Sequence, residues 1–312
     1  MRRVQTSGPS ISAGLTSGPV LRSRGIALII VLWILVLLSI TVGLYSVLAR
    51  TETLQSRFLF DVTQARYAAE AGLHRAVFEM RNPDLQTRWV PDGRPYLMEY
   101  AGAVVEMKVT DESGRIDLNG APAELLSEFL MSRGLEQEAA WQLADAIEDW
   151  RDPDDLPRLY GAEIDEYDAE GYPYGPANAP FRSVDELQQV IGMSFELFQR
   201  LENLVTVHGR GGRINPAFAP AEVIAGMPDI TLEDAQMFVA ERQQIHPADM
   251  TALMLPTGQM VNLQGVGGVF SIRSRATLEN GAWNEIEATV RAGADTRGRP
   301  FRILRWRENI ED

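Results

Sequence analysis

The feature that most constrains this chain is an uncharged apolar segment close to its N-terminus. Residues 26–49 carry no charged side chain, and about 20 such residues are enough for a helix to cross a hydrocarbon layer about 30 Å thick. The preceding residues include Arg2, Arg3, Arg22 and Arg24 and no acidic residue. Because positive charge is retained on the cytoplasmic side, we expect the chain to cross a membrane once, with a cytoplasmic N-terminus and an exported C-terminal domain. In a bacterium this would be the inner membrane, with the C-terminal domain in the periplasm.

The helical pattern continues beyond the apolar segment. Small and apolar residues recur at intervals of three and four, the spacing that places side chains on one face of a helix. They are Ala65, Ala68, Ala69, Gly72, Leu73, Ala76, Val77 and Met80. Asn82-Pro83 ends the pattern, because proline disfavours a helical conformation in the residue before it. The spacing predicts one helix over residues 26–81, half of it in the membrane and half packed on an exported domain.

A cleavable secretory signal peptide is the alternative for this region. Such a peptide has a shorter apolar core of about 7 to 15 residues followed by small residues at the cleavage site, and Val47 and Ala49 imitate such a site. The helical pattern that continues past Arg50 favours a retained helix. A mature chain starting at Arg50 would instead indicate a freely secreted protein.

The exported part is acidic and lacks cysteine. Of the 29 Lys and Arg residues, four precede residue 26, and none of the 43 Asp and Glu residues does, so residues 26–312 carry a formal charge of −18. This charge disfavours a nucleic-acid surface. Without cysteine the chain has no disulfide, no thiol nucleophile and no thiolate metal ligand.

Strand patterns lie at both ends of the exported part. Residues 96–110 are rich in Tyr, Val and Met and predict one or two strands. Residues 269–279 alternate between apolar and polar side chains, and Asn280-Gly281 follows, a dipeptide favoured in two-residue hairpin turns. Residues 283–291 and 301–307 predict two more strands. An antiparallel sheet packed on the long helix is therefore expected.

The residues between these strands have a helical pattern. The expected helices cover residues 122–131, 136–150, 183–191, 195–205, 219–225 and 232–242. Helices that interrupt a sheet in sequence indicate an inserted lobe, and the fold class is α+β. We expect five regions: a cytoplasmic leader (1–25), a transmembrane segment (26–49), the periplasmic half of the helix with the first strands (50–112), an inserted α-helical lobe (113–255) and C-terminal strands (256–312).

The expected lobe contains an internal repeat. Gly-Arg-Ile-Asp at residues 114–117, followed by Ala-Pro-Ala-Glu at 121–124, recurs 98 positions later as Gly-Arg-Ile-Asn at 212–215 and Ala-Pro-Ala-Glu at 219–222. An Asp or Asn side chain can bridge a turn, and proline is favoured near the first position of a helix. The repeat predicts two related helix starts.

Several segments carry a resemblance to a known family. They are the Arg24-Gly25 junction, Ala-Glu-Ala-Gly-Leu at residues 69–73, Gly-Arg-Ile-Asp-Leu-Asn at 114–119, Ala-Asp-Ala-Ile-Glu-Asp-Trp-Arg-Asp at 144–152, Tyr-Gly-Ala-Glu at 160–163 and Ser-Val-Asp-Glu-Leu at 183–187. Together and in this order they resemble the minor pseudopilin K of type II secretion systems, the general secretion pathway protein K family. The resemblance covers nearly the whole chain after Arg22.

The resemblance implies a type IV pilin-like fold, in which a long N-terminal helix packs on an antiparallel sheet. It implies cleavage after Gly25 by a prepilin peptidase, usually with methylation of the new N-terminus at Ile26. It also implies assembly with the minor pseudopilins I and J into the tip of a periplasmic pseudopilus that supports export of folded proteins across the outer membrane. No enzymatic activity, no nucleic acid and no small-molecule substrate is expected.

The fifth residue of the expected mature chain is Ile30. Most pilin-like subunits have Glu at this position, where its carboxylate can pair with the N-terminus of a neighbouring subunit. Because an unpaired charge in an apolar bundle is costly, this Glu is useful to a subunit that docks beneath another. Ile30 is therefore predicted to mark a subunit at the tip.

An acidic segment is the second candidate site. Residues 145–170 contain eleven carboxylates against Arg151 and Arg158. Calcium takes about six to eight oxygen ligands and tolerates irregular loops, although the segment has no EF-hand pattern and a solvated acidic turn would have the same composition. Members of the resembling family bind calcium in this lobe, which favours a structural ion here. The expected ligands are Asp152, Asp154, Asp155, Glu163 and Asp168.

Other functions remain as alternatives. A minor pilin of a type IV pilus or of a DNA-uptake pseudopilus would give surface fibres, twitching or transformation defects on deletion, whereas loss of a secretion pseudopilin would leave exoproteins in the periplasm. A membrane-anchored hydrolase is disfavoured, because no nucleophile or substrate cleft accompanies the paired carboxylates. The leader before Arg22 is longer than the family often has, which leaves the position of the start codon open.

Overall fold

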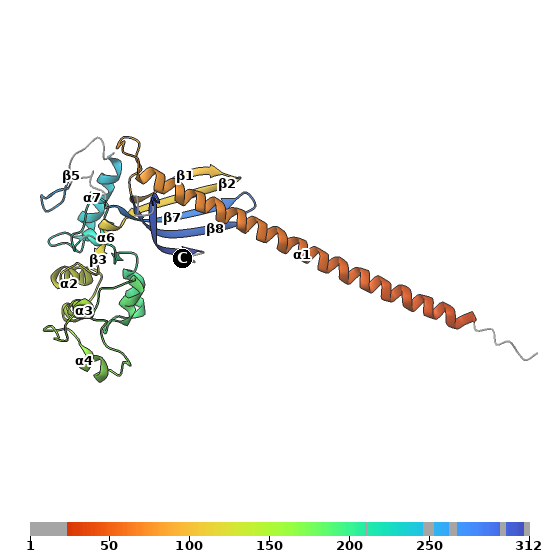
Figure 1. Ribbon diagram of the computed structural model, residues 1–312, viewed down its shortest axis with the longest axis horizontal. Helices are drawn as coiled ribbons and strands as arrows, with labels where there is room; N and C mark the ends of the chain where they lie inside the picture. Colours follow the sequence, from red (N-terminus) through yellow and green to blue (C-terminus); the bar gives the residue numbers. More distant parts are fainter. Residues whose placement is uncertain (1–23, 210, 246–252, 262–266, 294–297, 309–312) are drawn as a thin grey trace, which may run out of the picture. The chain divides into compact units, whose positions relative to one another are not determined.

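The predicted long helix forms, as α1, from Arg24 to Met80. The computed structural model describes residues 24–209, 211–245, 253–261, 267–293 and 298–308 (Figure 1). The chain divides into two units, residues 1–58 and residues 59–312, and each is described by itself. The predicted leader, apart from its last residues, lies outside the described part of the chain.

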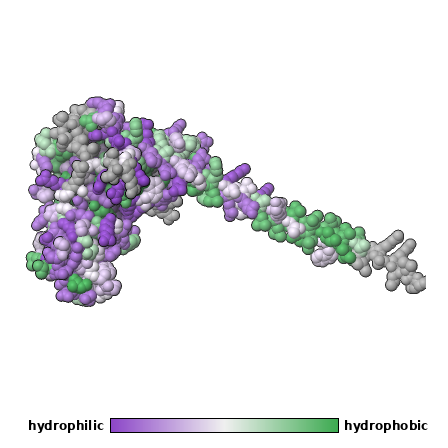
Figure 2. Space-filling view, in the orientation of Figure 1, coloured by the Kyte–Doolittle hydropathy of each residue, from purple (hydrophilic) through white to green (hydrophobic). Residues whose placement is uncertain are grey.

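The described part of the first unit is the N-terminal part of α1, which contains the apolar segment of residues 26–49. Its apolar side chains are exposed, and Figure 2 shows the hydrophobic surface along this stretch. The hydroxyls of Ser39, Thr41 and Ser46 donate to the carbonyls four residues earlier, with O···O distances of 2.8, 2.6 and 2.8 Å. Polar groups satisfied within the helix suit a hydrocarbon environment. Among the described residues, α1 is the one helix long and apolar enough to cross a membrane.

The second unit contains the predicted antiparallel sheet. The strands are β1 (Asp92–Tyr100), β2 (Ala103–Asp111), β7 (Val269–Leu278), β8 (Trp283–Ala292) and β9 (Phe301–Glu308). They pair in the order β1-β2-β7-β8-β9, and each neighbouring pair is antiparallel. The expectation of a long helix on an antiparallel sheet, with helices inserted between its strands, is confirmed.

The small residues of α1 allow the helix to lie close to this sheet. The face that the spacing predicted is buried, and it shares one core with side chains such as Val105, Ile272 and Ile286. The Ser274 hydroxyl donates to the Ala69 carbonyl at 2.7 Å. A Cβ atom at Gly72 would overlap this hydroxyl and lie 2.7 Å from Val105 Cγ1. Glycine at position 72 is therefore required by the close approach of backbone and sheet.

The hairpin between β7 and β8 differs from the prediction. The Leu278 amide donates to the Ala282 carbonyl, and the Gly281 amide donates to the Leu278 carbonyl. The loop therefore has three residues, and only Gly281, with φ of 84°, has a positive φ within it. A three-residue loop that ends in a left-handed glycine is the next most common hairpin connection. The predicted two-residue turn at Asn280-Gly281 is wrong.

The lobe between β2 and β7 has its own hydrophobic core, which includes Phe129, Ile147, Tyr167 and Phe218. Its α-helices are α2 (Ala123–Ser132), α3 (Gln137–Arg151), α4 (Ile164–Ala169), α5 (Phe195–Leu201), α6 (Ala221–Ile224) and α7 (Leu232–Gln244). Its 3₁₀ helices are η1 (Glu112–Gly114) and η2 (Val184–Gln189). Its short strands are β3 (Ile116–Asp117), β4 (Val205–Thr206), β5 (Leu253–Met254) and β6 (Met260–Val261).

Three expectations for this lobe need correction. The helix expected over 183–191 is the 3₁₀ helix η2, and the helix expected over 195–205 ends at Leu201. Val205 and Thr206 form β4 instead, because they pair in parallel with Ile116 and Asp117 of β3. The acidic segment is not all loop, since it contains α4.

The repeat forms two equivalent turns. The Asp117 carboxylate accepts from the Asn119 amide at 3.1 Å, and the Asn215 side-chain oxygen accepts from the Ala217 amide at 3.1 Å. The carbonyls of Asp117 and Asn215 accept from the amides four residues later. Proline precedes the first residue of both α2 and α6. The predicted pair of related helix starts is confirmed.

The lobe begins and ends at neighbouring points of the sheet. Asp111, the last residue of β2, is the register partner of Phe270 near the start of β7. Glu112, the next residue, accepts a hydrogen bond from Ser271 at 2.7 Å and another from the Thr206 hydroxyl. A buried carboxylate thus links the sheet to β4 of the lobe.

Candidate metal centre

The acidic segment folds around the end of α3. The helix ends at Arg151 because Pro153 follows, and Asp152 is already extended, with φ of −79° and ψ of 161°. The chain then passes through residues 153–162 to α4, which starts after Glu163. The Asp149 carboxylate accepts from the Arg158 amide at 3.2 Å, and the Glu163 amide donates to Glu166 at 2.9 Å. The first hydrogen bond holds the loop against the end of α3, and the second caps the start of α4.

Buried oxygen atoms without a hydrogen-bond donor occur in this segment and on Asn178, whose side chain donates to Asp155. They are Asp149 Oδ1, Asp152 Oδ1, Glu163 Oε1 and Asn178 Oδ1. Asp149 is 0 % exposed and Glu163 is 3 % exposed. A buried carboxylate oxygen without a donor is costly and needs a compensating partner. Carboxylate and amide oxygens are the donors that calcium prefers, so this donor set fits a calcium ion.

The protonation equilibria reflect the crowded negative charge. The pKa of Glu163 is raised to about 7, first by burial and then by the nearby carboxylates of Asp149, Asp152, Asp155 and Asp154, in that order of importance. Burial also raises the pKa of Asp149 to about 6, although the amides of Arg158 and Ala162 and the Arg158 guanidinium oppose the shift. Both carboxylates are therefore destabilised in their charged form in the absence of a cation.

The nearest basic side chains are already engaged. Arg158 forms an ion pair with Glu148 at 2.5 Å and lies 3.7 Å from Asp149 Oδ1. Glu148 also accepts from the guanidinium of Arg151 and from the Ala123 amide, each at 3.0 Å. Glu148 is thus satisfied by arginine and backbone groups, which leaves Asp149, Asp152 and Glu163 as the carboxylates that lack a full set of partners.

Gly161 fixes the position of Asp149. A Cβ atom at residue 161 would overlap Asp149 Oδ2. The loop therefore lies directly on this carboxylate, an approach that only glycine permits. The Tyr-Gly-Ala-Glu segment of the sequence thus closes over the end of α3.

The predicted ligands are distributed unevenly. Asp152 and Glu163 have unpartnered buried oxygens. Asp154 Oδ1 accepts from the Leu156 amide at 3.0 Å, and Asp155 Oδ1 accepts from the Asn178 side chain at 2.7 Å. Asp168 lies exposed on α4. Among the described residues, no three His, Asp or Glu side chains stand in a ready-made metal-ligating arrangement. The five ligands stay a prediction.

Sequence reasoning missed Asp149 and Asn178. Asp149 lies on the buried side of α3, in the Ala-Asp-Ala-Ile-Glu-Asp-Trp segment, and a buried aspartate in an apolar helical pattern was a usable signal. Asn178 is remote in sequence, and its φ of 45° marks an unusual backbone conformation that no sequence pattern indicated.

The expected processing residues lie at the start of α1. Gly25 and Ile26 are in its first turn, and Ile30 is exposed in the apolar stretch. Cleavage between Gly25 and Ile26, methylation of Ile26 and the role of Ile30 stay predictions.

Comparison with known proteins gives consistent results. Residues 108–210 match the family described as "Type II secretion system (T2SS), protein K". The chain is 30 % identical over 201 residues to the type II secretion system protein K of Klebsiella pneumoniae, covering 58 % of this chain and 61 % of that protein. It is 27 % identical over 242 residues to the protein of the same name from Pseudomonas aeruginosa, covering 70 % and 72 %. The chain thus spans about three fifths of the first curated relative.

A solved structure supports the fold. The crystal structure of the GspK-GspI-GspJ complex from the enterotoxigenic Escherichia coli type 2 secretion system contains a chain with a TM-score of 0.51 and 18 % identity, and the match covers 84 % of this chain and 99 % of that chain. At this identity the likeness concerns the fold, and it agrees with the long helix, sheet and inserted helices described above.

Proposed function

Residues 108–210 match the protein K family of type II secretion systems, and from this premise we propose that the chain is a minor pseudopilin at the tip of a type II secretion pseudopilus. The match of these residues is the single observation that carries the proposal. The arrangement of a long apolar helix before an antiparallel sheet supports it. The proposed role is the export of folded proteins across the outer membrane, and it requires no reaction catalysed by the chain.

The membrane arrangement follows from α1. Its apolar first half is the proposed inner-membrane anchor, and the arginines before it favour a cytoplasmic N-terminus and a periplasmic sheet and lobe. Prepilin peptidase is the proposed processing enzyme. It would cut after Gly25 and leave Ile26 as the methylated N-terminus. The anchor would remain attached to the exported domain.

The proposed partners are other minor pseudopilins of the I and J types. The similar E. coli chain was solved in a complex of GspK with GspI and GspJ. On the soluble part of α1, Phe60, Tyr67 and Phe78 remain exposed on the side away from the buried stripe. Exposed aromatic side chains at helical spacing suit packing against a second helix.

A structural calcium ion is the proposed cofactor. Asp149, Asp152, Glu163 and Asn178 would supply oxygen atoms, with Asp154 and Asp155 close by. A divalent cation would neutralise the excess charge and provide the missing partner of the buried oxygens. It would fix residues 152–163 onto α3.

A deletion experiment tests the proposed role. In the source bacterium, removal of the gene should leave exoproteins in the periplasm, and a plasmid copy should restore their release. N-terminal sequencing of the membrane-extracted protein should give Ile26. A deletion that leaves secretion intact but abolishes twitching or DNA uptake would favour the minor-pilin alternative and contradict the proposal.

A further inference from the structure

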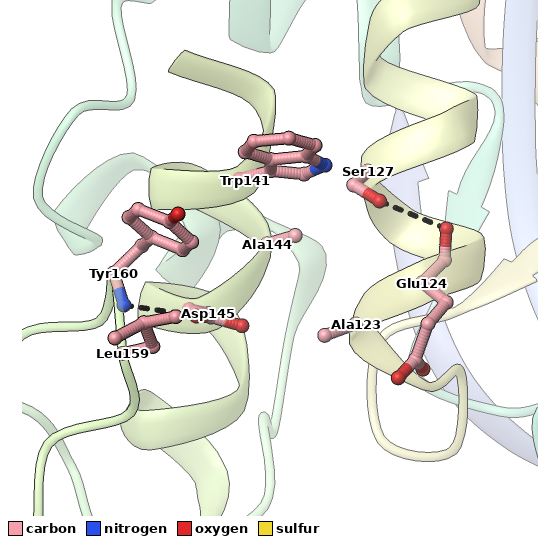
Figure 3. Close-up of a pocket in the computed structure, with 8 residues that line it drawn as sticks. All are labelled: Ala123, Glu124, Ser127, Trp141, Ala144, Asp145, Leu159 and Tyr160. Carbon is pink, nitrogen blue, oxygen red and sulfur yellow. Dashed lines mark hydrogen bonds between the residues drawn. The ribbon is translucent and has the colours of Figure 1, made fainter. Parts of the chain in front are cut away.

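A cleft lies between α2, α3 and the loop that follows α3. It encloses about 260 Å³, and Figure 3 shows the side chains that line it. They are Ala123, Glu124, Ser127, Trp141, Ala144, Asp145, Leu159 and Tyr160. This cleft shares no side chain with the proposed calcium ligands, and the proposed secretion role does not use it.

Aromatic and aliphatic side chains form its outer wall. The rings of Trp141 and Tyr160 stack with centroids 5.7 Å apart and an interplanar angle of 28°. Leu159 is 86 % exposed. Large apolar and aromatic side chains exposed beside a cleft are typical of a surface that binds another molecule.

Two carboxylates give the cleft a negative charge. Asp145 Oδ2 accepts from the Tyr160 amide at 3.1 Å, which also holds the loop against α3. In the described part of the chain, neither Asp145 nor Glu124 forms an ion pair, and no Lys or Arg side chain lines the cleft. The cleft therefore presents stacked aromatic rings and carboxylates without an ion-pair partner to any side chain that enters it from another molecule.

We propose that this cleft binds an arginine side chain presented by a protein partner next to an apolar residue. A guanidinium group stacks on aromatic faces and pairs with carboxylates, and it is weakly hydrated compared with an ammonium group. The two carboxylates are opposite in charge to the guanidinium group, and Leu159 provides a place for the neighbouring apolar side chain. The volume suits one long side chain.

The wall of the cleft is fixed by the fold. The Tyr160 amide is bonded to Asp145, and the Arg158 amide is bonded to Asp149, one helical turn further along α3. Both acceptors are on α3, so the loop that carries Leu159 and Tyr160 is attached to the helix that carries Trp141. The arrangement is present before any partner binds.

Fluorine NMR of the full chain in lipid nanodiscs tests the proposal. The six tryptophans are replaced by 5-fluorotryptophan, and Trp141→Phe identifies the signal of Trp141. The probe is a capped pentapeptide, Ala-Leu-Arg-Leu-Ala, and the matched control peptide has citrulline in place of arginine. The arginine peptide should shift the Trp141 signal in a saturable way, and the citrulline peptide should bind at least about threefold more weakly.

Isosteric variants assign the binding to the two carboxylates. Asp145→Asn keeps an acceptor for the Tyr160 amide, and Glu124→Gln changes an exposed side chain, so neither should unfold the lobe. Each should raise the dissociation constant of the arginine peptide by about threefold, whereas Glu196→Gln on α5 should not change it. An unmoved Trp141 signal, equal binding of the citrulline peptide, or unchanged binding by both cleft variants would overturn the proposal.

Discussion

Arg151 and Arg242 make the same contacts in the two halves of the repeat. The guanidinium of Arg151, on α3, donates to the carbonyls of Leu118 and Ala121, and that of Arg242, on α7, donates to the carbonyls of Pro216 and Ala219. The two pairs of acceptors are 98 positions apart, the same offset as the sequence repeat. Each arginine thus holds the turn that precedes the first helix of its own helix pair.

Arg242 should therefore be critical for the second repeat. Its side chain is 4 % exposed, and burial lowers its pKa to about 10. Arg242→Leu would leave the carbonyls of Pro216 and Ala219 without donors, and we expect a loss of about 2 to 4 kcal/mol in unfolding free energy. Denaturant unfolding of the lobe measures it. Arg200→Leu on α5, which removes a single exposed hydrogen bond to the Arg133 carbonyl, is the control. An equal effect of both variants would contradict the assignment.

Calcium should stabilise the protein. At a calcium concentration 100 times the dissociation constant, a single site adds about 2.7 kcal/mol to the unfolding free energy. Thermal unfolding with calcium and with EDTA measures the difference. Glu163→Gln and Asp149→Asn should abolish most of the stabilisation by calcium, whereas Glu196→Gln should retain this stabilisation. Absence of calcium binding by titration calorimetry together with no rise in Tm would remove the proposed site.

The metal-free protein should lose stability as the pH rises. Glu163 and Asp149 have folded pKa values of about 7 and about 6, raised from 4.5 and 3.8. At pH values between the unfolded and the folded pKa of each carboxyl group, the folded state binds more protons than the unfolded state. The unfolding free energy therefore decreases from about pH 4 to about pH 7. The Glu163 contribution is roughly 2 to 3 kcal/mol.

Denaturant unfolding in EDTA at pH 5 and pH 8 checks this dependence. Glu163→Gln should flatten it, because glutamine does not titrate, and saturating calcium should remove the loss at pH 8. A metal-free protein that is more stable at pH 8 than at pH 5 would show that the two carboxylates are not destabilised as described.

The packing of α1 on the sheet should depend on Gly72. A Cβ atom there would meet Ser274 Oγ and Val105 Cγ1, and overpacking of this kind costs about 1 to 3 kcal/mol. Gly72→Ala should lower the unfolding free energy although alanine favours helices. Gly43→Ala is the matched control, because no atom lies within 4 Å of a Cβ at that position. Equal stability of Gly72→Ala and the parent chain would contradict the close packing.

Ile30 should matter for assembly. Ile30→Glu would place a carboxylate in the apolar stretch of α1, where a subunit at the tip has no neighbour ahead to neutralise it. We expect reduced exoprotein release at an unchanged amount of protein in the membrane, and Ile30→Leu should behave as the parent chain. Unchanged assembly and secretion with Ile30→Glu would show that the missing Glu does not define the tip.

Periodic and local patterns explain what the sequence could predict. The small-residue face of α1, the alternation in β7 and the repeated Asp117 and Asn215 turns each depend on neighbours within a few residues. Contacts between distant segments escaped prediction. The pairing of Ile116 with Val205 ended the helix that was expected to reach residue 205, and Asn178 joins the acidic segment only because the chain returns to Asp155. The hairpin at Gly281 was misjudged because its length depends on strand register.

The register pairing of Asp111 with Phe270 has a consequence for evolution and engineering. Because the lobe leaves and rejoins the sheet through two adjacent strands, its two ends are held about 5 Å apart whatever lies between them. Homologous proteins can therefore enlarge, shrink or exchange this module while the pilin-like scaffold beneath it stays the same. A short linker in its place would produce a minimal subunit, in which assembly could be studied apart from whatever the module recognises.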